Sequence, residues 1–257
     1  MPISGVLLDL AGVVYEENRI IPGSLAAIEQ LRARQVRIRF VTNTTRSSKD
    51  EILRTLEVMG LGIASDELFT PIEAARNWLA TNGATPHLLV HPAIESEFSG
   101  LPDGPRNAVV VGDVGHRLDY IAMNAAFRTL LNGADLIALA KNRSFRDHDG
   151  KLSLDAGPFV AALEFASNRI ALVLGKPSPD FFKAALASMQ CLPHQVAMVG
   201  DDAESDVAGA INAGIGMGIL VRTGKYRPGD EERFIHRPTA TVADLSASVD
   251  FILSHLE

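Results

Sequence analysis

Short runs of apolar residues alternate along the chain with amphipathic segments of helical period. The runs are rich in Val, Ile and Leu and contain few polar positions, which is typical of strands that are covered on both faces. The expected strands are residues 6–9, 36–42, 88–91, 108–112, 136–140, 170–174, 196–200 and 218–221.

Helix signals lie between these runs. A helix over 24–34 is expected after Pro22-Gly23, with Ser24 as a candidate N-cap. The letters SKDE at 48–51 have the pattern of a capping box that opens a helix over 52–59. A segment over 122–132 ends at a glycine, and a segment over 179–189 begins with a proline. This alternation of strands and helices predicts an α/β fold with a mainly parallel sheet.

Two positions are candidate domain boundaries, one near residues 70–71 and the other near residue 168. The segment between them has strands and helices of its own and could be an inserted second domain.

Polar residues follow four of the apolar runs directly. Because all carboxyl ends of the strands in a parallel sheet lie on one edge, where ligands bind, residues far apart in sequence could converge there. The residues are Asp9, Thr42 with Asn43, Lys176, and Asp201 with Asp202, and Asp206 follows in the next helical turn.

These side chains form a coherent chemical set. Asp9, Asp201 and Asp202 would repel one another unless a cation lay among them, and carboxylate oxygens suit Mg²⁺. A lysine and hydrogen-bond donors could then bind a phosphoryl group and stabilise its oxygens during transfer. A carboxylate in such a site can itself be the nucleophile and form an aspartyl phosphate.

Each element also has an ordinary explanation when it is taken alone. Asp9 could cap a turn, Thr42 and Asn43 could enter a helix, and Lys176 could be a solvated residue of a turn. The acidic residues from 201 to 206 could simply favour the amino end of a helix. Their common position after apolar runs makes a shared site the better explanation.

Composition narrows the classes of partner. The chain has 257 residues, 47% of them hydrophobic and 21% charged, and a formal net charge of -7. This negative charge argues against a protein that binds nucleic acid or anionic membranes in general. It does not argue against binding of a small anionic ligand. The single cysteine, Cys191, excludes an intrachain disulfide, and no stretch has the length and apolar character of a membrane span. We expect a cytoplasmic protein.

The ordered set of motifs resembles the haloacid dehalogenase superfamily of aspartate-nucleophile phosphatases. The matching stretches are DLAGVV at 9–14, VTN at 41–43, GKPSP at 175–179 and GDDAESD at 200–206. Further stretches resemble the class IIA, NagD-like members, which carry a large cap, and in particular the branch of phospholysine phosphohistidine inorganic pyrophosphate phosphatase. These stretches are IPGS at 21–24, LDAGPFVAALEFAS at 154–167 and VRTGKYRPGDEE at 221–232.

The resemblance implies a doubly wound, Rossmann-like core over 1–71 and 171–257 and an inserted α/β cap over 72–170. Caps of this class often help to form dimers, so a homodimer is one alternative. The substrate would be a small phosphorylated molecule or a labile phosphoryl bond. The resemblance implies that Asp9 attacks phosphorus and that Mg²⁺ is bound by the Asp9 carboxylate, the Asp201 carboxylate and the backbone carbonyl of Ala11. It implies that Thr42, Asn43 and Lys176 bind the phosphate and that Lys176 also orients the nucleophile. Asp202 and Asp206 would support these residues from outside the site.

Ala11 departs from the pattern of the family. Most phosphatases of the family carry there a second aspartate that protonates the leaving group and then activates water, a step that contributes about 10²- to 10⁴-fold. Either substrates with good leaving groups are favoured, or the protein mainly binds phosphorylated ligands with little turnover. A third alternative, a carbon–halogen hydrolase that uses Asp9, needs no metal, and the acidic motif at 200–206 therefore counts against it.

Two residues of the inserted segment are weaker candidates. Asp113 and His116 follow an apolar run and could either face the substrate or be ordinary loop residues. The stretch GIGMG at 214–218 lacks the spacing of a dinucleotide-binding loop and follows a helix, so we discount it.

Overall fold

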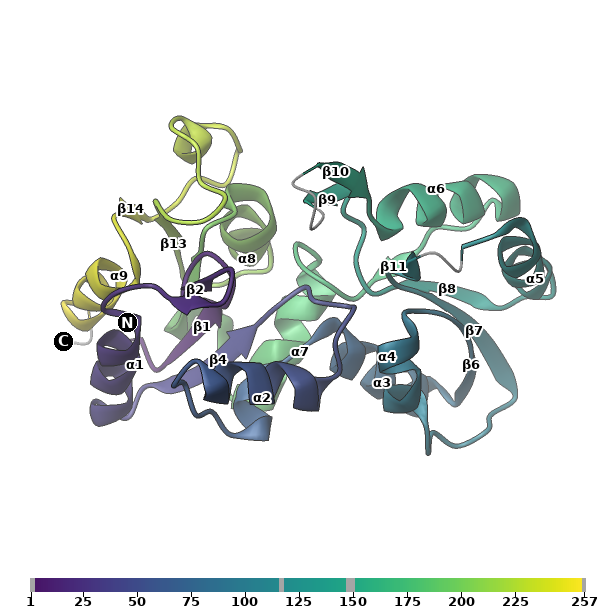
Figure 1. Cartoon of the computed structure of the whole chain (residues 1–257), viewed down its shortest axis with the longest axis horizontal. Helices are drawn as coiled ribbons and strands as arrows, with labels where there is room; N and C mark the ends of the chain where they lie inside the picture. The colour runs from purple at the N-terminus through teal and green to yellow at the C-terminus, as the bar shows by residue number, and fades with distance from the viewer. Residues whose placement is uncertain (1–2, 116–117, 147–150, 256–257) are drawn as a thin grey trace. The chain divides into compact units, whose positions relative to one another are not determined.

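The computed structural model describes residues 3–115, 118–146 and 151–255 (Figure 1). Contacts within the chain divide it into two compact units. The first comprises Met1–Thr42, Lys49–Phe69 and Lys176–Glu257, and the second comprises Asn43–Ser48 and Thr70–Gly175. The predicted domain limits at 71/72 and 170/171 stay a prediction.

The first unit is built on a six-stranded parallel sheet with the order β14-β13-β12-β1-β4-β5. The strands are β1 (Gly5–Asp9), β4 (Arg37–Val41), β5 (Leu68–Phe69), β12 (Val196–Gly200), β13 (Met217–Val221) and β14 (Ala240–Val242). The chain proceeds from β1 through β4 to β5 on one side and adds β12, β13 and β14 on the other. The order therefore reverses between β1 and β12, and such a switch point is where open α/β sheets bind their ligands.

Helices cover both faces of this sheet. On one face α1 (Ser24–Ala33), α2 (Lys49–Val58) and α9 (Leu245–Leu253) bury their apolar stripes against alternate residues of β1, β4, β12 and β13. On the other face lie α7 (Pro179–Met189), a π-helical turn η5 (Ala203–Ala208) and α8 (Gly209–Asn212). β1 and β12 are fully buried as a result, and the expected doubly wound α/β core is confirmed.

Smaller elements complete the first unit. A two-stranded hairpin of β2 (Tyr15–Glu16) and β3 (Arg19–Ile20) follows β1 directly. Short 3₁₀ turns lie at η1 (Ser65–Glu67), η4 (Pro193–Gln195) and η6 (Asp230–Glu232).

The second unit has its own parallel sheet of four strands, in the order β11-β8-β7-β6. The strands are β6 (Ala84–Leu89), β7 (Arg106–Val111), β8 (Asp135–Ala138) and β11 (Leu172–Val173). Helices α5 (Tyr120–Leu131) and α6 (Ala156–Ser167) pack on one face, and α3 (Pro71–Asn82) contacts β6 and β7. The unit also contains α4 (Pro92–Glu95), η2 (Ser96–Phe98) and an antiparallel pair, β9 (Ser144–Arg146) and β10 (Leu152–Leu154).

Three predictions about local structure are wrong. The strand expected over 88–91 ends at Leu89, because His91 instead caps α4 by accepting a hydrogen bond from the Ala93 amide. Ser24 is the first residue of α1 rather than its N-cap, since Gly23 takes the cap position with a φ of 87°. The run over 170–174 contributes only β11, which pairs with β8 in the sheet of the second unit.

The helix over 179–189 is confirmed residue for residue, and Ser178 caps it by accepting a hydrogen bond from the Asp180 amide. Among the described residues, no helix has both the length and the apolar surface needed to cross a bilayer.

Candidate active site

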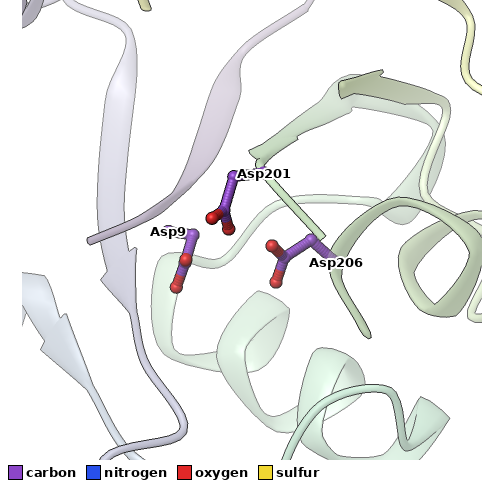
Figure 2. A group of neighbouring side chains, drawn as sticks. All are labelled: Asp9, Asp201 and Asp206. Carbon is purple, nitrogen blue, oxygen red and sulfur yellow. The ribbon is translucent and has the colours of Figure 1, made fainter. Parts of the chain in front are cut away.

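Two aspartates lie at the switch point of the core sheet. Asp9 is the last residue of β1, and Asp201 follows the last residue of β12, the strand that pairs with β1. Asp9 is only 6% exposed, and Asp201 is only 1% exposed. The apolar strands therefore deliver two carboxylates side by side into a buried position (Figure 2).

Asp206 joins them from the π-helical turn η5. One carboxylate oxygen from each of Asp9, Asp201 and Asp206 lies within 4.8 Å of the others. Gly200 makes this approach possible, since a Cβ there would lie 2.2 Å from the Cβ of Asp206. The expected convergence of the acidic residues thus has a specific steric requirement.

Lys176 lies among these carboxylates and is 4% exposed. Its Nζ donates to Asp9 Oδ1 over 2.5 Å and to Asp206 Oδ1 over 2.6 Å. Burial alone would lower the pKa of Lys176, but the two carboxylates outweigh it and raise that pKa above the ordinary value. We expected Lys176 to follow a strand of the core sheet. It lies instead in the turn three residues before α7, and the preceding strand β11 belongs to the sheet of the second unit.

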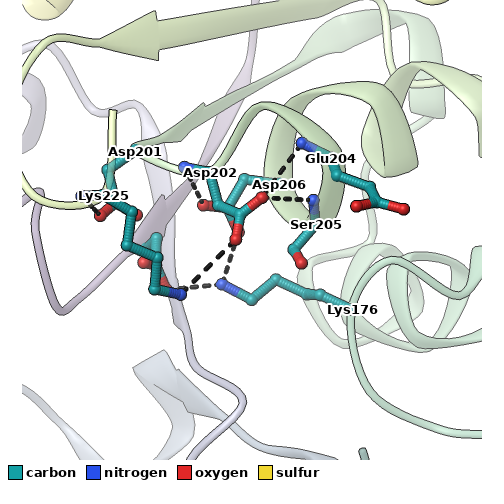
Figure 3. Close-up of polar contacts among 8 residues, drawn as sticks. Lys176, Asp201, Asp202, Glu204, Ser205, Asp206 and Lys225 are labelled. Carbon is teal, nitrogen blue, oxygen red and sulfur yellow. Dashed lines mark hydrogen bonds and ion pairs between the residues drawn. The ribbon is translucent and has the colours of Figure 1, made fainter. Parts of the chain in front are cut away.

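Asp202 is oriented by backbone groups. Its Oδ1 accepts hydrogen bonds from the amides of Glu204 and Ser205, over 3.1 Å and 2.9 Å, and so caps η5. Its own amide donates to Asp206 Oδ2 over 3.2 Å (Figure 3). Burial opposes ionisation, but the Ser205 amide and the Lys225 ammonium group hold the pKa of Asp202 below its ordinary value.

The loop after β13 closes the site, and its role was missed in the sequence. The Lys225 amide donates to Asp201 Oδ2 over 2.7 Å, and the Thr223 hydroxyl donates to the Gly12 carbonyl. Gly12 and Gly224 both have positive φ, and a Cβ on either would lie within 2.1 Å of Asp201 Oδ2. The signal in the sequence was the stretch VRTGKYRPGDEE at 221–232, which resembles the class IIA members but was assigned no role in the site.

The charges of the cluster do not balance. Four carboxylates (Asp9, Asp201, Asp202 and Asp206) face two ammonium groups (Lys176 and Lys225), which leaves two negative charges when all are ionised. Burial, and then the charge of Asp9, raise the pKa of Asp201 to about 6. Burial also raises the pKa of Asp206, and the neighbouring carboxylates add to this effect against the opposing charge of Lys176.

The donor set fits a divalent cation. The buried Oδ1 of Asp201 has no hydrogen-bond partner among the described residues, although a buried polar atom ordinarily has one. A hard cation would satisfy this oxygen and neutralise the two excess charges.

The remaining residues predicted for the site lie outside the cluster of carboxylates and lysines described above. Thr42 is buried directly after β4, the strand that pairs with β1 on the side away from β12. Asn43 belongs to the second unit, where its Oδ1 would lie 3.0 Å from a Cβ added to Gly175. Ala11 is exposed. Asp113 forms a bidentate ion pair with Arg46, at 2.5 Å and 3.2 Å, while His116 lies outside the described residues.

Comparison with known proteins shows which family the chain belongs to. A family model for haloacid dehalogenase-like hydrolases matches residues 6–101, and a HAD-hydrolase-like model matches residues 173–248. The haloacid dehalogenase-like hydrolase domain-containing protein 2 of Bos taurus is 44% identical over 254 residues, which cover 99% of this chain and 97% of that protein. The chain belongs to the haloacid dehalogenase-like hydrolase family. The resemblance seen in the sequence motifs is thereby confirmed.

Other members of the haloacid dehalogenase-like family match over the same length. The phospholysine phosphohistidine inorganic pyrophosphate phosphatase of Homo sapiens is 38% identical, over 99% of this chain and 96% of its own. Among solved structures, 4-nitrophenylphosphatase of Thermotoga maritima is 28% identical with a TM-score of 0.86, over 96% of this chain and 97% of its own. NagD of E. coli K-12 has a TM-score of 0.85 over 96% of this chain and 98% of its own; at 23% identity it supports the fold.

In metal-free buffer, Asp201→Asn should raise the free energy of unfolding at pH 8 by about 1–3 kcal/mol. The pKa of about 6 lies above the ordinary 3.8, so the native state holds the proton more tightly than the unfolded chain does. Stability from this group is therefore present at low pH and lost as the pH rises through 6. Urea denaturation in EDTA at pH 4.5 and pH 8 measures the effect, because the advantage of the neutral Asn should be much smaller at pH 4.5 than at pH 8.

The exposed Asp180→Asn is the matched control and should change stability by less than about 0.5 kcal/mol at either pH. An Asp201→Asn variant that is destabilised equally at both pH values would contradict this electrostatic account.

Proposed function

We propose that the protein is a Mg²⁺-dependent phosphatase that acts on a small phosphorylated molecule through a phosphorylated Asp9. The observation that carries the proposal is the buried set of three carboxylates around Lys176, in which Asp201 Oδ1 has no hydrogen-bond partner in the described part of the chain. The names of the similar proteins, a phospholysine phosphohistidine inorganic pyrophosphate phosphatase and a 4-nitrophenylphosphatase, support the same reaction class.

Asp9, Asp201 and the backbone carbonyl of Ala11 would hold Mg²⁺. When bound, the ion offsets the negative charge of the carboxylates and of the phosphoryl oxygens. The carbonyl of Ala11 is available whatever side chain stands there, so the departure at this position leaves the metal site intact.

Asp9 would act as the nucleophile. One of its carboxylate oxygens forms a bond to phosphorus, and the bond from phosphorus to the leaving oxygen breaks with its electron pair on that oxygen. Water then cleaves the acyl phosphate, which releases inorganic phosphate and regenerates the carboxylate. Lys176, 2.5 Å from Asp9, would orient the nucleophile and contact the phosphoryl group, together with Thr42 and Asn43.

Lys176 is held by Asp206 in turn, and Asp202 fixes Asp206 through its amide. These contacts support roles for both aspartates in positioning the lysine. The segment over 72–170 would act as a cap domain that selects the substrate, and a homodimer stays a prediction.

A binding protein with vestigial turnover is the second candidate function. Ala11 favours it, since the alanine has no group that could protonate a leaving group or activate water. Turnover of a substrate with a good leaving group separates the two candidates, because such a substrate does not need the missing acid.

Asp9→Asn should lower turnover of p-nitrophenyl phosphate at least about a thousandfold, because an amide cannot accept the phosphoryl group. Initial rates with Mg²⁺ and with EDTA provide the measurement, and EDTA should abolish the activity of the unmodified protein. Asp180→Asn is again the control and should stay within about twofold. Retention of metal-dependent activity by Asp9→Asn would exclude the mechanism.

Ala11→Asp should raise the turnover of poor substrates such as phenyl phosphate by about 10²-fold or more, and that of p-nitrophenyl phosphate far less. The reason is that an added acid helps most when the leaving group is a strong base. Position 11 is exposed, so the larger side chain has room. If neither substrate gained while the unmodified protein turned both over well, the chain would not be lacking an acid.

A further inference from the structure

Lys225 is a cation at the candidate site to which neither the sequence motifs nor the proposed mechanism assigns a role. It belongs to the loop that follows β13 and is anchored by its own amide, which donates to Asp201 Oδ2 over 2.7 Å. Its side chain is 70% exposed, whereas that of Lys176 is 4% exposed. Figure 3 shows both lysines directed toward the same group of carboxylates.

The ammonium group of Lys225 is held only loosely by the protein. Its ion pair with Asp202 Oδ2 spans 3.6 Å, while Lys176 makes two contacts of 2.5 Å and 2.6 Å. The orientation of Asp202 does not require this pair, since two backbone amides bind its other oxygen. An exposed cation with one long contact can turn to an incoming anion at little cost.

Ala11 creates the need for such a cation. A leaving group that receives no proton departs as an anion, and its charge must be stabilised by hydrogen bonds or by a positive group. Lys176 is already engaged by Asp9 and Asp206, at 2.5 Å and 2.6 Å. Lys225 is an exposed cation whose own amide binds the site residue Asp201.

We propose that Lys225 binds the leaving group and stabilises its negative charge electrostatically, in place of the absent acid at position 11. This inference rests on the proposed phosphatase function. The bond from phosphorus to the leaving oxygen breaks with both electrons on that oxygen, and the ammonium group donates a hydrogen bond to it without transferring its proton. Substrates whose leaving group is anionic, such as phosphoanhydrides, benefit most, because their second phosphoryl group binds the same cation before the reaction.

A series of aryl phosphates tests the charge on the leaving oxygen. Lys225→Met should make the dependence of log(kcat/KM) on the pKa of the leaving phenol steeper, with losses of about tenfold or more for the most basic phenols. Lys225→Arg should restore most of the slope. Arg227→Met removes an exposed cation from the same loop and should leave the slope unchanged. In the Ala11→Asp background the effect of Lys225→Met should shrink, because the acid replaces the cation.

A role limited to balancing Asp202 or supporting the metal site predicts something else. Lys225→Met would then change the rates of all aryl phosphates by the same factor, with no change of slope. That outcome would overturn the proposal while leaving the phosphatase function intact.

Binding provides a test that needs no turnover. In Mg²⁺ and at constant ionic strength, Lys225→Met should weaken binding of methylenediphosphonate about tenfold and binding of inorganic phosphate by less than about threefold, measured by calorimetry. Equal weakening of both ligands, or of neither, would refute the role of Lys225 in binding the leaving group. If the unmodified protein binds both ligands but hydrolyses no aryl phosphate, the phosphatase function fails separately.

Discussion

The charge buried at the end of β1 and β12 is the constraint on which the rest of the site depends. Burying carboxylates away from water costs several kcal/mol for each ion unless partners compensate. Lys176 compensates in part, through ion pairs to Asp9 and Asp206, but the cluster of four carboxylates and two lysines stays negative. The divalent cation that we propose would complete the balance, and the Asp201 Oδ1, which has no hydrogen-bond partner among the described residues, would coordinate it.

The surrounding backbone is arranged to leave room for this charge. Gly12 and Gly224 approach Asp201 so closely that any side chain would displace its carboxylate, and Gly200 does the same for Asp206. Both Gly12 and Gly224 also adopt positive φ, which other residues rarely tolerate. Close backbone contact from three separate loops therefore holds together carboxylates as far apart in sequence as Asp9 and Asp201.

The sequence predicts the central part of this site because the strand ends and helix starts that form it are marked by neighbouring residues. Apolar runs that end in a carboxylate identified Asp9 and Asp201, and the proline in its first turn marked the start of α7. The run over 170–174 misled, because a short apolar run carries no information about which sheet it joins. Lys176 still lies with Asp9, but it reaches the site through the turn before α7.

The role of the loop with Gly224 and Lys225 was missed for a different reason, although the resemblance had already drawn attention to this stretch. Glycine next to lysine is typical of a solvated turn, and only the approach of Asp201 gives the pair a function. Membership of the haloacid dehalogenase-like hydrolases is established by similarity over the whole chain, whereas the roles of Thr42, Asn43 and the Ala11 carbonyl stay predictions. Ala11, at the position where the resemblance places a second aspartate, is the departure on which the proposed leaving-group chemistry depends.

The most direct test of the central claim is titration of the protein with Mg²⁺ by calorimetry at pH 8 and at pH 5. The account predicts one ion per chain at pH 8, much weaker binding at pH 5 where protons compete for the carboxylates, and no binding by Asp201→Asn at either pH. Absence of Mg²⁺ binding at pH 8, or binding that survives Asp201→Asn unchanged, would contradict it.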